Sequence, residues 1–149
     1  CYIYVNVFLL KVLWMKFNKF KIAIIGLGYV GLSNAVLLAQ HNEVIGIDIS
    51  QQRVDAVNAR ISPVKDRDLS AYLAHKSLKL LASTDFDGSV PGADYIIVST
   101  PTDYNEKTNS FDTSTVEEVI EKAIKIEPNA CGVEHINPIV EQYKGQCCK

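Results

Sequence analysis

A short apolar run that leads directly into a glycine-rich turn is the feature that most constrains the fold. Residues 21–26 read K-I-A-I-I-G, and residues 26–31 read G-L-G-Y-V-G. A brief β-branched run without polar positions is typical of a strand buried on both faces, as in parallel sheets covered by helices. Glycines that follow such a strand and open a helix predict a strand–turn–helix unit of the kind that binds dinucleotides.

The rest of the chain repeats this alternation of strand and helix. The patterns predict further strands over 43–48, 78–82 and 94–99 and helices over 29–40, 51–60, 66–75 and 114–126. Ser50 and Thr113 stand where helix-capping residues are expected, and residues 101–112 read as a polar loop. We therefore predict the α/β class, with a Rossmann-type doubly wound parallel sheet.

Each glycine of the motif has a distinct predicted role. Gly26 permits the tight turn, Gly28 lets the backbone approach a pyrophosphate, and Gly31 lets the helix pack closely on the strand. The unpaired N–H groups at the start of the helix would then bind the phosphates. The alternative is a glycine turn that holds no ligand.

An acidic residue completes the fingerprint. Asp48 lies 22 positions after Gly26, where about 20 is expected. Its carboxylate would accept hydrogen bonds from the adenosine ribose and repel a 2′-phosphate, so the predicted cofactor is NAD and not NADP. Arg53 could pair with a 2′-phosphate, pack over the adenine edge, or lie in solvent.

Composition excludes several other classes. The charge of −2, from 15 basic and 17 acidic residues, gives no reason to expect nucleic acid or an anionic membrane as a partner. The four cysteines form no C-x-x-C pair, so we predict no metal site and a reducing cytoplasm. Residues 1–14 are apolar but too short for a span of about 20 residues. We expect them to lie outside the functional protein, with a weak membrane anchor as the alternative.

Several stretches together resemble the UDP-glucose/GDP-mannose dehydrogenase family. They are K-I-A-I-I-G-L-G-Y-V-G-L at 21–32, V-I-G-I-D-I at 44–49, S-P-V at 62–64, S-T-P-T-D-Y-N at 99–105 and N-S-F-D-T at 109–113. The last two are similar to the loop of the members that oxidise UDP-glucose. The resemblance covers about residues 15–130, which we expect to form the NAD-binding domain.

The resemblance implies roles for further residues. Tyr29 and Val30 would lie under the pyrophosphate, Asp48 and Arg53 would bind the adenosine side, and Thr102 would contact the cofactor where the fourth strand ends. A plain turn residue is the alternative for Thr102. In the intact family enzyme, which is expected to be a homo-oligomer, UDP-glucose is oxidised to UDP-glucuronate by two NAD.

The chain departs from the family pattern after residue 130. The family continues with a strand similar to K-S-T-I-P-x-G, and residues 131–149 contain no such sequence. We therefore expect a divergent tail, a truncated sheet whose last strand has an unpaired edge, and no catalytic residue. Cys147 and Cys148 lack the glycine-rich stretch that precedes the family's nucleophilic cysteine.

These observations predict the NAD-binding portion of a UDP-glucose-oxidising enzyme that is inactive by itself. Two alternatives stay open at this point. One is a dinucleotide-binding module without catalysis, and the other is a fragment of another nucleotide-sugar dehydrogenase. A fragment of a 2-hydroxy-acid or 3-hydroxyacyl dehydrogenase would share the glycine loop but not residues 99–113.

Overall fold

The centre of the molecule is a parallel sheet of five strands. The computed structural model describes residues 19–75, 77–100, 103–105, 110–112 and 114–134. The strand order is β3-β2-β1-β4-β7, and all four neighbouring pairs are parallel. The strands are β1 (Lys21–Ile25), β2 (Glu43–Ile47), β3 (Leu80–Ser83), β4 (Tyr95–Val98) and β7 (Cys131–Glu134). Because the order runs outward in both directions from β1 and β4, the predicted doubly wound fold is confirmed.

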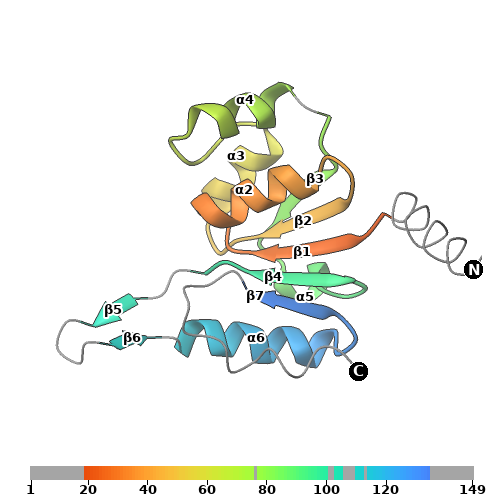
Figure 1. Cartoon of the computed structure of the whole chain (residues 1–149), viewed down its shortest axis with the longest axis vertical. Helices are drawn as coiled ribbons and strands as arrows, with labels where there is room; N and C mark the ends of the chain where they lie inside the picture. Colours follow the sequence, from red (N-terminus) through yellow and green to blue (C-terminus); the bar gives the residue numbers. More distant parts are fainter. Residues whose placement is uncertain (1–18, 76, 101–102, 106–109, 113, 135–149) are drawn as a thin grey trace, which may run out of the picture.

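Helices cover both faces of the sheet. On one face lie α2 (Tyr29–Leu38), α3 (Gln51–Asn58) and α4 (Arg67–His75), and on the other lie α5 (Phe86–Ser89) and α6 (Ser114–Ile126) (Figure 1). Two apolar cores result, and β1 supplies both. Ile22 and Ile24 face the α2–α4 core, whereas Ala23 and Ile25 face the α5–α6 core. This alternation explains why the strand is apolar at every position from Ile22 to Ile25.

The expectation of an unpaired β4 edge is wrong. Residues 131–134 form β7, which pairs with β4 in the register Tyr95↔Cys131 to Val98↔Glu134. The sequence C-G-V-E has a weak strand signal because it contains one β-branched residue and a glycine. The strand forms because α6 delivers the chain to the open edge of β4, where main-chain hydrogen bonds are available. The rest of the predicted tail lies outside the described residues.

The segment predicted to be a loop also contains strands. Asp103–Asn105 (β5) and Ser110–Asp112 (β6) pair antiparallel as a separate two-stranded sheet. Asp85 caps the short helix α5 by accepting a hydrogen bond from the Gly88 N–H. Ser50 caps α3 as predicted, while Thr113 lies outside the described residues. Within the described ranges, no helix is long and apolar enough to cross a membrane.

Arg60 carries a local strain that a single substitution should relieve. It follows α3 in the left-handed conformation, at φ 61°, and the Ile61 N–H donates to the Ala56 carbonyl as in a glycine-terminated helix. That conformation costs a non-glycine residue about 1–2 kcal/mol, and Nη1 of Arg60 is buried without a hydrogen-bond partner.

We expect Arg60→Gly to stabilise the chain by about 1 kcal/mol, because the relieved strain outweighs the lost bond from Nη2 to the Leu78 carbonyl. Urea unfolding of the cofactor-free protein measures this difference. Arg60→Lys is the matched control, since it keeps the strained backbone and should bring no gain. A glycine variant that is less stable than the unmodified chain would contradict the interpretation.

Candidate functional site

The carboxyl ends of β1, β2 and β4 meet at one edge of the sheet. The strand order reverses between β1 and β4, and open α/β sheets bind their ligands at such a point, outside the carboxyl ends of the strands. Figure 1 shows these strands pointing toward the side from which β5 and β6 extend. Every described residue that the sequence assigned to the cofactor lies on β1, β2, or the loops and helices that follow them.

Gly26 and Gly31 are required by close backbone approach. A Cβ on Gly26, which has φ 97°, would lie 2.6 Å from the Ser99 carbonyl oxygen. A Cβ on Gly31 would lie 1.8 Å from the carbonyl oxygen of Gly26. Both obstacles are backbone atoms, so neither can rotate away. These two glycines therefore allow the turn and the seating of α2 against β1, as the motif predicts.

Gly28 is different, because the space in front of it is open. A Cβ there would meet no atom within 4 Å, and its φ of −76° suits any residue. It is the N-cap of α2, with no side-chain capping bond and no acidic residue in the first turn. Tyr29 and Val30 beside it are 57% and 48% exposed. The positive end of the helix dipole is thus accessible to an anion, and the absent Cβ leaves room for it.

Asp48 connects the glycine loop to the next strand and helix. It follows β2 and is only 6% exposed. One carboxylate oxygen accepts the Leu27 N–H at 2.7 Å and the other accepts the Ser50 N–H at 2.9 Å. A carboxylate has about four acceptor positions, so these bonds leave capacity for a ligand hydroxyl.

Arg53 lies next to this carboxylate. Its Nη1 is 3.4 Å from Asp48 Oδ2, and its side chain is 49% exposed. The long distance and the exposure make this a weak ion pair, so the guanidinium remains free to contact another group. Among the described residues, no group of three His, Cys, Asp or Glu side chains could hold a metal ion.

The structure thus brings together the three glycines, the start of α2, Asp48 and Arg53. Thr102 lies outside the described residues. Ser99 and Thr100, which directly follow β4, belong to the stretch 99–105 but were given no individual role from sequence. Their hydroxyl oxygens are buried and have no hydrogen-bond partner. The sequence signal that could have drawn attention to them is the presence of two consecutive hydroxyl residues at the end of an apolar strand.

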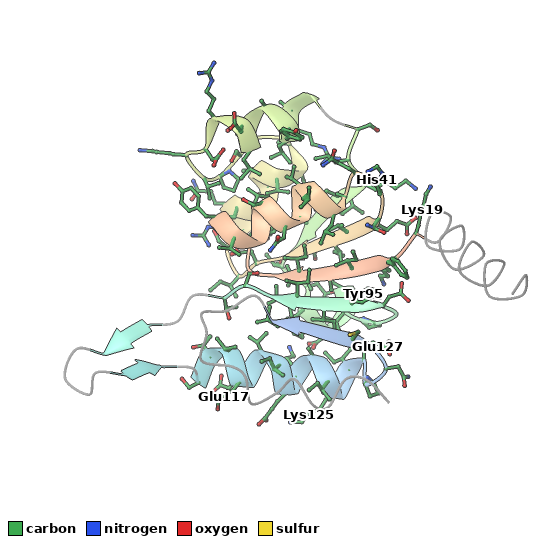
Figure 2. The ribbon with its side chains drawn as sticks, viewed as in Figure 1. Lys19, His41, Tyr95, Glu117, Lys125 and Glu127 are labelled. Carbon is green, nitrogen blue, oxygen red and sulfur yellow. The ribbon has the colours of Figure 1, made fainter. Side chains whose placement is uncertain are left out.

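A hollow of about 380 Å³ opens at the opposite end of the strands. It is lined by Lys21, Glu43, Val44, Ile45, Arg60, Leu78, Lys79, Leu80 and Leu81. Figure 2 shows Lys19, His41 and Tyr95 on this amino-terminal side of the sheet. There Lys79 lowers the pKa of Lys19, first through a side-chain hydrogen bond and then by charge repulsion. No residue of the glycine loop lines this hollow.

Comparison with known proteins identifies the relatives of this arrangement. Residues 20–132 match the model of the UDP-glucose/GDP-mannose dehydrogenase family, NAD binding domain. A UDP-glucose 6-dehydrogenase of Streptococcus pneumoniae is 45% identical over 123 residues, which are 83% of this chain and 31% of that protein. A UDP-glucose 6-dehydrogenase of Campylobacter jejuni is 38% identical over 102 residues, 67% of this chain and 26% of that protein. The chain therefore spans less than a third of the length of these relatives.

Solved structures agree with the sequence matches. A GDP-mannose dehydrogenase from Pseudomonas aeruginosa superposes with a TM-score of 0.65 at 29% identity, over 78% of this chain and 29% of that one. An NDP-N-acetyl-D-galactosaminuronic acid dehydrogenase from Methanosarcina mazei gives a TM-score of 0.69 at 23% identity, over 83% and 29% of the two chains. The second likeness supports the fold alone.

Proposed function

The chain belongs to the UDP-glucose/GDP-mannose dehydrogenase family, and on that premise we propose that it is the NAD-binding part of an enzyme that oxidises UDP-glucose to UDP-glucuronate. The observation that carries this proposal is the open N-terminus of α2 at Gly28, with the buried Asp48 carboxylate beside the same loop. The choice of UDP-glucose is supported by the two relatives named UDP-glucose 6-dehydrogenase. The cytoplasm as compartment and a homo-oligomer for the intact enzyme are part of the proposal.

Different residues would hold different parts of NAD, which accepts a hydride when it is bound. The pyrophosphate lies at the N-terminus of α2, where Gly28, Tyr29 and Val30 contribute backbone N–H groups. Asp48 accepts hydrogen bonds from the adenosine ribose, and Arg53 packs beside the adenine. Thr102, beyond β4, is the remaining proposed contact.

We expect NAD to bind the unmodified chain at least about tenfold more tightly than NADP. A 2′-phosphate at the adenosine ribose would lie near the Asp48 carboxylate, and like charges at short range in a partly buried site repel strongly. The ion pair between Arg53 and that carboxylate is weak, at the long distance of 3.4 Å, so Arg53 offsets little of the repulsion. Calorimetric titration with both cofactors at low and high salt provides the measurement, and high salt should narrow the difference.

Asp48→Asn is the matched variant for this experiment. It removes the charge but keeps the size of the side chain, so the preference for NAD should shrink mainly through tighter NADP binding. Equal affinities for NAD and NADP in the unmodified chain would contradict the assignment of Asp48. Absence of binding by either cofactor to the folded chain would contradict the proposed function itself.

A module that binds a dinucleotide without catalysis is the second candidate. It is supported by the glycine loop and the Asp48 carboxylate, which would hold a dinucleotide whether or not a reaction follows. The two candidates differ in what UDP-glucose does. A protein that contains the proposed NAD-binding part together with the remainder of the family sequence should form NADH on adding UDP-glucose, whereas a binding module should hold NAD unchanged.

A further inference from the structure

One edge of the main sheet is formed by β3. This strand stands at one end of the described strand order, and β2 pairs with its inner side. An edge strand presents N–H and C=O groups to which another chain can add as a further strand. The sequence L-K-L-L-A-S at 78–83 favours such pairing, because it is mostly apolar, carries a single charge and contains neither proline nor glycine. Leu81 within it is 69% exposed, so β3 has the features of a strand that a second copy could extend.

The outward-facing groups of β3 follow from those that face β2. The Lys79 carbonyl accepts the Val44 N–H at 2.9 Å, and the Ser83 carbonyl accepts the Asp48 N–H at 3.2 Å. Main-chain groups of successive residues in a strand point to alternate sides of that strand. The N–H and C=O of Ala82, next to Ser83, therefore point to the outer edge, where an added strand would bond to them.

The side chain of Asn58 occupies this place on the edge. Asn58 is the last residue of α3. Its Oδ1 accepts the Ala82 N–H at 2.8 Å, and its Nδ2 donates to the Ala82 carbonyl at 3.0 Å. A side-chain amide offers an acceptor and a donor, as a peptide group does, so it satisfies both groups of one residue. Arg60, which follows α3, adds a bond from Nη2 to the Leu78 carbonyl at 2.9 Å.

We propose that Asn58 substitutes for a neighbouring strand on β3 and thereby closes this edge against pairing with a second copy of the chain. The partner that the open edge fits is the same strand of another molecule. A twofold axis perpendicular to the sheet makes two β3 strands antiparallel and places Leu81 of both copies on one face. Its exposed side chain then adds an apolar contact to the main-chain bonds. This inference is independent of NAD binding.

The test compares two asparagines that make the same kinds of bonds in the full chain. Asn58→Ala removes both bonds to Ala82. Asn42→Ala is the matched control, because Asn42 Oδ1 accepts the Phe20 N–H at 3.2 Å and Nδ2 donates to the Leu38 carbonyl at 3.1 Å, beside the central strand β1. Both substitutions should lower the Tm similarly. Only Asn58→Ala should strengthen self-association over that of the unmodified chain, by about tenfold or more, the effect of roughly one hydrogen bond. Sedimentation over a range of concentrations measures it.

Two further measurements identify the surface that associates. Leu81→Lys, added to Asn58→Ala, places like charges on both strands of the antiparallel pair, so self-association should return to that of the unmodified chain. Hydrogen exchange reports on the edge itself. The Ala82 amide should be protected in the unmodified chain, lose protection in dilute Asn58→Ala, and regain it at concentrations where that variant associates.

Several results would overturn the inference. Equal self-association of Asn58→Ala and Asn42→Ala would show that association follows from lost stability and not from an open edge. Association of Asn58→Ala no stronger than that of the unmodified chain, or unaffected by Leu81→Lys, would also overturn it. If Asn58→Ala does not fold, the Ala82 amide of the unmodified chain decides. Exchange as slow as that of the Val44 amide, which bonds Lys79 within the sheet, supports the inference, and exchange at the rate of an unprotected amide contradicts it.

Discussion

Replacing Gly31 with alanine is expected to remove most of the stability of the fold. The added Cβ would lie 1.8 Å from the carbonyl oxygen of Gly26 and 3.2 Å from the Ser99 Cβ. Overpacking ordinarily costs about 1–3 kcal/mol when side chains can adjust. Here the first obstacle is backbone, so α2 must move away from β1, and we expect a loss above about 3 kcal/mol from a total of about 5–15 kcal/mol. Urea unfolding of the cofactor-free chain measures it.

Gly28→Ala is the matched control for that substitution. It adds the same methyl group three residues earlier, where no atom lies within 4 Å and φ is −76°. Its stability should fall by no more than about 1 kcal/mol, the effect of a poorer N-cap. NAD affinity should nevertheless fall by about tenfold or more, because the methyl group occupies the approach to the pyrophosphate. Equal losses of stability in the two variants would show that the two glycines do not have the separate roles assigned to them.

The second large effect is expected for Asp48→Ala. The carboxylate accepts the Leu27 and Ser50 N–H groups at 2.7 and 2.9 Å while only 6% exposed. Hydrogen bonds to charged groups contribute about 1.5–3 kcal/mol each, and an alanine leaves both donors without this acceptor. We therefore expect a stability loss of about 3 kcal/mol or more, together with weaker NAD binding. Thermal and urea unfolding measure the first effect, and titration at low temperature measures the second.

Asp48→Asn separates the two contributions of this side chain. The amide retains one acceptor oxygen but presents an NH₂ group to one of the two backbone donors, so its stability should lie between those of alanine and aspartate. An alanine variant as stable as the unmodified chain would show that the two bonds contribute nothing to folding.

The unit from β1 to α2 could be predicted from sequence because its signals are local. The apolar run at 22–25 and the spacing of the three glycines are read from neighbouring residues, and Asp48 is found by its separation from Gly26 along the chain. The structure has β1 at Lys21–Ile25 and α2 beginning at Tyr29. The doubly wound parallel class of the sheet also followed from sequence, because parallel strands joined by helices allow few right-handed arrangements.

Other features were decided only by tertiary contacts. The stretch C-G-V-E at 131–134 has little strand propensity and becomes β7 because β4 offers it an edge of unpaired main-chain groups. The bonds from Asp48 to the Leu27 and Ser50 N–H groups join segments that no periodicity connects.

Gly28 and Gly31 also show the difference between what sequence predicts and what tertiary packing decides. Sequence identifies both as members of one motif, yet only the packing of α2 on β1 shows that the first faces open space and the second faces backbone. The unpartnered hydroxyls of Ser99 and Thr100 were likewise invisible in the sequence, because burial depends on which segments surround a residue. Local pattern thus determined the elements and the motif of this protein, whereas long-range packing decided which groups are enclosed, which are paired and which remain available to a ligand.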